Sequence, residues 1–491
     1  MQSDMFADMN SCPGPYGSSK PLNSRRNFLH SAGAGFGLVA LQSMLGRDGL
    51  LASPAQPVVA NPLEARGSHY SGSAKNVIFL FMAGGPSHVD LLDYKPDLVK
   101  LAGKPIPESF GSFKTRRKVA KNNLLGPLRP FHKHGQSGVE ISEWLPNIAE
   151  CADDICVLRG CYGDSVTHPE SVYLMNTGSI LMGRPSLGSW VAYGLGSEND
   201  NMPAFVVMPD PKGWVKGGAP AWSNGYLPAT YQGTILRGGK TPILNLNNPQ
   251  DISNRQQRDT VDLINKLNRG SLRAGSEESP LAARISAYEL AYRMQSHAHE
   301  VVDVAQESAP TRKMYGLDDP VTTEFGRRCL LARRMVERGV RFVQLYCGDK
   351  NGWDGHSKMD RNHSAHCAQS DLPVAGLLKD LKSRGMLDST LVIWGGEFGR
   401  MPMSEGTDGR DHNPHGFSMW MAGGGVKGGQ MIGATDPVGL RAAEERVHAH
   451  DLHATILHLM GMDHTKLTYR HNGQDERLTN VFGSLVSKVF A

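Results

Sequence analysis

The sequence predicts a layered α/β protein built around a mostly parallel sheet. Short apolar runs that end in glycine or aspartate recur along the chain, and helical spacing of apolar residues fills the intervals between them. The first run, KNVIFLFMAGG at 75–85, is continuously apolar, as is typical of strands buried on both faces of a parallel sheet. With 491 residues, 40% of them hydrophobic, the chain can bury one large core.

The remaining elements follow from the same patterns. Further strands are expected at 154–160, 204–210, 340–348, 389–396 and 416–425. Helical spacing predicts helices at 168–179, 184–196, 281–306, 324–339, 371–387 and 450–462. The stretch 211–280 is rich in Gly, Pro, Asn and Ser and lacks a clear period, which predicts a loop-rich excursion over the active face.

The first 60 residues differ in character from the rest. Arg25 and Arg26 precede an apolar segment of small residues, 31–45, and this resembles a twin-arginine export signal. A membrane anchor is the alternative, but the apolar run is shorter than the roughly 20 residues that a span needs. We therefore expect signal and linker at 1–60, a single domain at 61–491, and an exported, periplasmic or extracytoplasmic protein whose mature chain has no membrane span.

Charge and cysteine content constrain the partners. The formal net charge is only +4, so we expect no nucleic acid partner, and we interpret the basic run 114–121 as a solvated loop. Cys151, Cys156 and Cys161 match no zinc-binding spacing. One disulfide within 151–161 and buried free thiols remain equally open.

Polar side chains follow three of the predicted strands. Because ligands of open α/β sheets bind beyond the carboxyl ends of the strands, these loops should meet. The set comprises Ser87, His88, Asp90 and Asp93, then Asp349, Asp354, His356, His363 and His366, and finally Glu397, Arg400, Arg410, Asp411, His412 and His415. Any one pair is more typical of an ordinary surface hydrogen bond, but recurrence of carboxylates with imidazoles at three strand ends favours a metal site.

Five stretches carry a resemblance to a known family: GGPSHVDLLDYKP, GWDGH, LDSTLVIWGGEFGRMP, GRDHNPHGFSMWMAGGGVKGG and NGQDERLT. They resemble the DUF1501 family of exported bacterial proteins over most of the mature chain. That family is similar in turn to the alkaline phosphatase and sulfatase superfamily. The resemblance implies an alkaline-phosphatase-like, three-layer α/β/α fold with a mostly parallel central sheet.

The resemblance also implies metal ligands. Asp354 and His356 match the superfamily's ligand pair, and His412, or else His415, matches its late histidine. Glu397 occupies the place of an aspartate ligand, although a phenylalanine follows it where the superfamily has histidine. Asp90 is a further candidate, because two glycines stand where the superfamily has an aspartate after the first strand. One divalent ion is therefore expected, with Zn, Ca, Mg and Mn all open.

The implied reaction is ester hydrolysis. The nucleophile position falls at His168, as a nucleophile or a general acid and base, unless His168 merely starts a helix. Arg400 or Arg410 would hold an anionic group through a bidentate fork. The resemblance thus implies an exported metal-dependent hydrolase of phosphate or sulfate esters, polysaccharide esters included, without the formylglycine cysteine. The alternative is a catalytically degenerate sulfatase-like protein that acts as a binding or assembly factor in the cell envelope.

Overall fold

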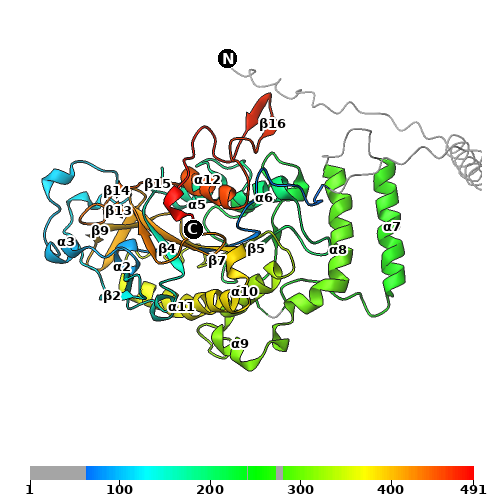
Figure 1. Cartoon of the computed structure of the whole chain (residues 1–491), viewed down its shortest axis with the longest axis horizontal. Helices are drawn as coiled ribbons and strands as arrows, with labels where there is room; N and C mark the ends of the chain where they lie inside the picture. Colours follow the sequence, from blue (N-terminus) through cyan, green and yellow to red (C-terminus); the bar gives the residue numbers. More distant parts are fainter. Residues whose placement is uncertain (1–61, 240, 272–279) are drawn as a thin grey trace, which may run out of the picture. The chain divides into compact units, whose positions relative to one another are not determined.

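A nine-stranded, mostly parallel sheet lies at the centre of the computed structural model, which describes residues 62–239, 241–271 and 280–491 (Figure 1). The strand order is β12-β4-β11-β8-β1-β7-β5-β6, and β15 lies beside β4. The bounds are β1 (Asn76–Met82), β4 (Ile155–Tyr162), β5 (Phe205–Met208), β6 (Thr234–Ile235), β7 (Phe342–Cys347), β8 (Thr390–Gly395), β11 (Phe417–Ala422), β12 (Gln430–Ile432) and β15 (Val447–His448). All six predicted strands are present, and of these β11 pairs antiparallel with its neighbours β4 and β8.

Helices cover both faces of this sheet, so the predicted three-layer arrangement is confirmed. Alternate side chains of β1 point to opposite faces, and Leu80 joins one hydrophobic core while Phe79 joins the other. The first core contains α4 (Pro146–Ala149), α8 (Pro280–Val302), α10 (Thr323–Val336) and α11 (Met359–Ser383). The second contains α5 (His168–Thr177), α6 (Leu187–Leu195) and α12 (Ala449–Leu459).

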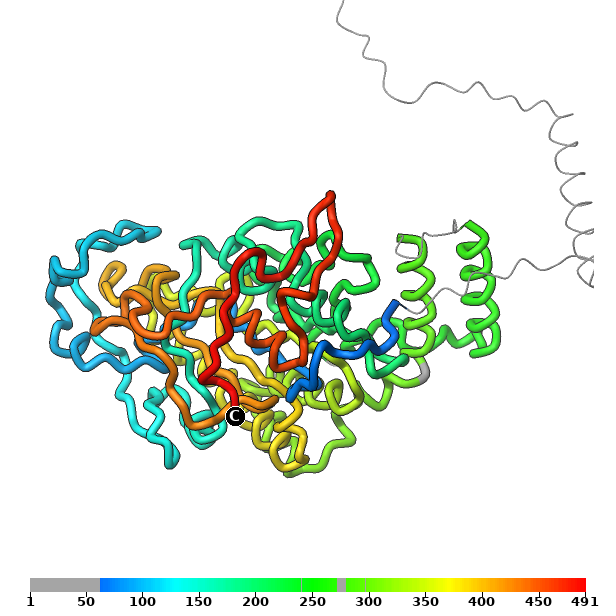
Figure 2. Tube along the Cα trace, turned by 45° about the horizontal axis from the view of Figure 1, so that its top comes forward, coloured from blue at the N-terminus to red at the C-terminus, as the bar shows by residue number. Residues whose placement is uncertain are grey.

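Two helices differ from the sequence prediction. Helix α11 begins at Met359, well before the predicted start at 371. Within the excursion 211–280, predicted as loop-rich, residues Asn254–Gly270 form α7, which lies alongside α8 at one end of the molecule (Figure 2). A capping box explains this helix, because the Ser253 side chain accepts from the Gln256 backbone and the Gln256 side chain accepts from the Ser253 backbone.

The stretch after β8, predicted as a glycine-rich loop, is a β-hairpin, so that prediction was wrong. Strands β9 (Gly399–Glu405) and β10 (Gly409–Asn413) pair antiparallel, with His412 opposite Arg400 and an irregularity at the intervening Asp411. A small separate core supports the hairpin and brings in α2 (His88–Leu91) and α3 (Pro96–Lys100). This hairpin carries several of the candidate site residues.

Apart from short 3-10 helices, the remaining described elements are three strand pairs and one helix. They are β2 (Phe131–His134) with β3 (Val139–Ser142), β13 (Ala434–Thr435) with β14 (Ala442–Glu444), β16 (Tyr469–His471) with β17 (Gln474–Glu476), and α9 (Ala309–Met314). The six cysteines in the described part of the chain are all free and buried, so of the two open alternatives the structure has the free thiols. No helix in the described ranges combines the length and apolarity that crossing a bilayer requires. The export signal expected at 1–60 lies outside the described residues.

Candidate metal centre

Three histidines converge on the carboxylate of Asp354, which follows β7. His168 Nε2 lies 2.9 Å from Asp354 Oδ2. On the other oxygen, Oδ1, His356 Nε2 lies at 3.0 Å and His412 Nε2 at 3.2 Å. The group is almost closed to solvent, because the Asp354 side chain is 8% exposed and His168 and His412 are fully buried. Residues from three separate parts of the chain thus meet at one carboxylate.

Each of these imidazoles is held from behind through its other nitrogen. His168 Nδ1 lies 2.7 Å from Glu397 Oε1, and His356 Nδ1 lies 2.5 Å from Glu405 Oε2. His412 Nδ1 lies 2.6 Å from the backbone oxygen of Val166. Carboxylate and carbonyl oxygens only accept hydrogen bonds, so in the neutral imidazoles the proton is on Nδ1.

A neutral imidazole in this tautomer turns its Nε2 lone pair towards the Asp354 carboxylate. Burial lowers the pKa of His412 to about 2, so its ring is neutral at ordinary pH. The buried Nε2 atoms of His168 and His356 have no hydrogen-bond partner despite their short distances to Asp354. Lone pairs facing a carboxylate repel it unless a cation lies between them, and metal-bound histidines typically donate their second nitrogen in this way. The donor set therefore fits a divalent metal ion.

The atoms fall into two overlapping groups of metal-ligand spacing. Ligand atoms of His168, Asp354 and His412 all lie within 4.8 Å of one another, as do those of His356, Asp411 and His412. Both Asp411 oxygens in the second group accept backbone N–H groups, from Arg117 at 2.7 Å and from His412 at 2.8 Å. Because the Asp411 oxygens are already used in this way, the first group is the stronger candidate.

Local structure explains how Asp354 reaches this position. A side chain at Gly84 would place its Cβ 2.7 Å from the Asp354 backbone nitrogen, and one at Gly85 would meet the Phe398 ring at 2.6 Å. Both glycines have positive φ, at 110° and 78°. The end of β1 therefore supplies no ligand side chain, but its glycines let the Asp354 loop and Phe398 pack against it.

The structure gives Glu397 a different place from the predicted one. Its carboxylate accepts the Gly84 backbone N–H at 2.9 and 3.1 Å and faces His168 Nδ1, so its lone pairs point away from the other ligands. Glu397 thus orients His168, and both its oxygens are used by Gly84 and His168. His168, predicted as a nucleophile or acid-base group, has both ring nitrogens engaged in this arrangement, which is the geometry of a ligand.

Asp90, Arg400 and Arg410 also differ from their predicted roles. Asp90 and Arg410 form a buried, two-point ion pair at 2.8 and 3.1 Å, which leaves Asp90 directed at a guanidinium and removes Arg410 from any ligand. Arg400 is fully buried and donates to Asp354 Oδ1 at 2.8 Å and to backbone oxygens of Gly84, Gly85 and Arg410. These four acceptors use four of its five N–H groups, so Arg400 mainly fixes Asp354.

Comparison with known proteins decides the family. Residues 74–490 match the family described as a protein of unknown function, DUF1501. The chain belongs to this family. A comparison of the DUF1501 chain with curated proteins finds no match.

Solved structures similar to this DUF1501 chain include a lipoteichoic acid synthase, an alkaline phosphatase and a sulfatase. They include the lipoteichoic acid synthase LtaP from Listeria monocytogenes, with 8% identity, 86% of this chain and 80% of that chain covered, and a TM-score of 0.35. The alkaline phosphatase of the Antarctic bacterium TAB5 has 11% identity, covers 80% and 99%, and has a TM-score of 0.33. The PsFucS1 sulfatase from Pseudoalteromonas sp. has 14% identity, covers 84% and 72%, and has a TM-score of 0.32.

Three basic residues at the centre were not predicted. Lys216 Nζ lies 2.8 Å from Asp354 Oδ2, and its side chain is 28% exposed. The basic run 114–121, predicted to be only a solvated loop, reaches the centre of this DUF1501 protein, where Arg116 lies 3.5 Å from His412 Nε2. Arg117 pairs with Glu405 at 3.1 Å. Unlike Arg400 and Arg410, all three are partly or largely open to solvent, so they are cations that a substrate can meet.

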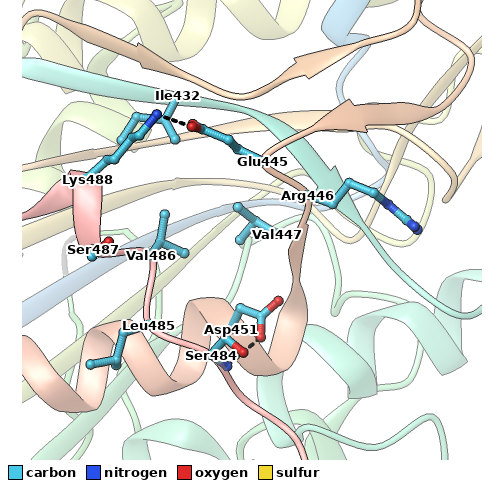
Figure 3. Close-up of a pocket in the computed structure, with 10 residues that line it drawn as sticks. All are labelled: Ile432, Glu445, Arg446, Val447, Asp451, Ser484, Leu485, Val486, Ser487 and Lys488. Atoms are coloured by element: carbon cyan, nitrogen blue, oxygen red, sulfur yellow. Dashed lines mark hydrogen bonds and ion pairs between the residues drawn. The ribbon is translucent and has the colours of Figure 1, made fainter.

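A separate hollow of about 220 Å³ lies between the β14–β15 region and the C-terminal segment (Figure 3). Two interactions close its ends, Lys488 with Glu445 and the Ser484 backbone with Asp451. None of the predicted site residues lines this hollow. In the described part of the DUF1501 chain, the metal-ligand geometry is found at Asp354 and not here.

Proposed function

We propose that this DUF1501 protein is an exported, metal-dependent hydrolase of phosphate or sulfate esters. The single observation that supports it best is the orientation of the three histidines, whose Nε2 lone pairs face Asp354 while their Nδ1 protons are donated elsewhere. Export rests on the twin-arginine-like segment that contains Arg25 and Arg26.

The ligand chemistry favours particular metals. Imidazole nitrogens with one carboxylate suit Zn or another transition metal better than Ca or Mg, which prefer oxygen ligands. A bound ion of this kind would polarise an ester oxygen and lower the pKa of a bound water to about 7. His168, Asp354 and His412 would hold the ion, and His356 borders the same carboxylate.

Charged residues around the site affect the ionisation of Asp354 and the kind of substrate that can bind. Burial raises the pKa of Asp354, whereas the charge of Arg400, which donates to Oδ1 at 2.8 Å, lowers it and favours the ionised carboxylate. Lys216 and Arg116 bring positive charge beside it, which favours an anionic substrate. Phe398 stacks on His412 with ring centroids 4.4 Å apart and keeps water from that face of the ring.

One observation favours a second candidate function. His168 stands at the predicted nucleophile position, but Glu397 and Asp354 occupy both sides of its ring. Hydrolysis by this centre would therefore use an activated water instead of a covalent intermediate. A protein that retains the metal and binds an anion without turnover is the second candidate, and it would serve in binding or assembly at the cell envelope.

Activity measurements with and without metal separate the two candidates. The purified protein is depleted with a chelator, reloaded with Zn, Mn, Mg or Ca, and assayed with 4-nitrophenyl phosphate and 4-nitrophenyl sulfate. Hydrolysis that returns with one metal and is lost in His412→Ala supports the proposal. Stoichiometric metal with turnover no faster than buffer would sink the hydrolase and leave the binding protein.

A further inference from the structure

A short segment of the excursion, 213–217, is fixed between two elements that carry the metal ligands. At one end, a Cβ on Gly213 would lie 3.6 Å from that of Asp349, in the loop that leads to Asp354. At the other end, the Tyr173 hydroxyl of α5, the helix that begins with His168, donates to the Gly217 oxygen at 2.9 Å. The segment therefore has a defined position beside the centre.

Within this segment the side chains alternate between core and solvent. Val215 is buried, whereas its neighbours Trp214 and Lys216 point outward. Trp214 is two residues before Lys216, so their Cα atoms lie within about 7.6 Å of each other. Because Lys216 contacts Asp354, the exposed Trp214 stands near the rim of the centre.

The Trp214 ring is exposed but rigidly supported. It is 49% exposed, and it packs edge-on at 5.4 Å against Trp222, which is completely buried. An indole left half in water costs hydrophobic free energy, and a supported, flat, apolar face is what a stacking ligand needs. The ring thus offers a fixed platform next to the charged centre.

Several cations lie beside this platform or at the adjoining centre. Lys212 and Lys350 stand on the two segments that meet at Gly213 and Asp349, and Lys216 and Arg116 reach the Asp354 centre. Two nearby acids already have partners, since Asp349 accepts backbone N–H groups of its own loop at 2.9 and 3.0 Å and Glu405 is shared by His356 and Arg117. Lys216 and Arg116 can therefore meet an anion on a ligand that also has an apolar face.

We propose that Trp214, Lys216 and Arg116 form a subsite for a negatively charged glycan. The C–H face of one sugar ring stacks on Trp214, and sulfate or phosphate groups of the glycan pair with Lys216 and Arg116, one of them reaching the Asp354 centre. This assignment rests on the proposed function, because it names the substrate class of that same centre. A polynucleotide also combines flat rings with anions, but a chain with net charge +4 lacks the basic surface that would favour it.

Three matched probes separate the contributions of ring and charge. They are sulfated maltotetraose, unmodified maltotetraose and tripolyphosphate, each titrated by calorimetry and by quenching of tryptophan fluorescence. Sulfated maltotetraose should bind more tightly than either other probe. Trp214→Ala should weaken it by about fivefold to tenfold, the range of one aromatic contact. Trp214→Phe should restore most of the loss, and neither change should alter tripolyphosphate binding.

Lys216→Ala should weaken both anionic probes, and Tyr288→Ala, at an aromatic residue on α8 of similar exposure, should weaken neither. Unchanged binding of sulfated maltotetraose in Trp214→Ala would overturn the subsite, as would an equal loss of tripolyphosphate or tighter binding of a single-stranded oligonucleotide. Hydrolysis of the 4-nitrophenyl esters, together with sulfated maltotetraose binding that does not depend on Trp214, overturns this inference alone. Glycan binding that depends on Trp214, without ester hydrolysis, overturns the hydrolase alone.

Discussion

Glu397→Gln tests whether the residue behind His168 tunes the metal. The wild-type carboxylate accepts hydrogen bonds from His168 Nδ1 at 2.7 Å and from the Gly84 N–H at 2.9 and 3.1 Å. An amide has one acceptor and one donor end, so either orientation sets its NH₂ against an N–H of Gly84 or of His168. The substitution also removes the negative charge that makes the imidazole a better ligand.

The expected effect on metal affinity can be bounded. The milder amide orientation keeps the His168 bond and clashes only at the longer Gly84 distance. We therefore expect about a tenfold loss of affinity, roughly 1.4 kcal/mol, at the lower end of the range for such supporting groups. Glu397→Ala, which leaves His168 without any acceptor, should lose about 100-fold. Competition with a chromogenic chelator measures both values.

Glu444→Gln is the matched control, because this exposed glutamate lies in β14, away from the centre. Thermal unfolding of each metal-free variant shows whether the fold is retained. If Glu397→Gln and Glu397→Ala fold and bind metal as tightly as the wild type, Glu397 does not support metal binding through His168.

Three further predictions concern groups outside the ligand set. Asp90→Asn leaves the buried Arg410 charge unpaired, so it should lower the free energy of unfolding in denaturant by about 3 kcal/mol. Its metal content should stay at the wild-type value. Loss of metal without loss of stability would indicate that Asp90 is a metal ligand. Burial lowers the pKa of His453 from 6.5 to about 3. Since the unfolded chain then takes up a proton between these pH values that the folded chain does not, stability falls as pH drops through this window, by roughly 1.4 kcal/mol per unit, and is fully present above pH 6.5. His453→Gln, which keeps a donor for the Met175 oxygen, should shift the acid-unfolding midpoint seen by circular dichroism to lower pH, and an unchanged midpoint would contradict this. Burial raises the pKa of Cys156, Cys161 and Cys347 to about 12. In a Cys12→Ser background, a thiol reagent at pH 8 should therefore label the native protein hardly at all and the unfolded protein fully. Rapid labelling of the native protein would contradict the burial of these thiols.

The features predicted best were the strands that consist of one uninterrupted apolar run. The strand runs at 75–85 and 389–396 are apolar throughout, so their burial could be read without knowledge of their neighbours. Helix α7 was missed although a signal existed, since Ser253 and Gln256 have the spacing of a capping box in a polar stretch.

The site could be predicted only in part, because its contacts are long-range. Lys216 and Asp354 are 138 positions apart, and no pattern in either segment pairs them. Strand β10 is fully buried yet polar, and its burial depends on partners such as Asp90 for Arg410, which become visible only in the fold. The same applies to Glu397, whose motif position indicated a ligand but whose neighbour is His168.

The central claim is that His168, Asp354 and His412 hold one divalent metal ion. Elemental analysis of the purified protein, wild type against His412→Ala and Asp354→Ala, tests it most directly, with circular dichroism to verify that each variant is folded. We expect about one metal ion per wild-type chain and almost none in either folded variant. A wild type without metal after growth and reloading with Zn or Mn, or variants that retain the full complement, would contradict it.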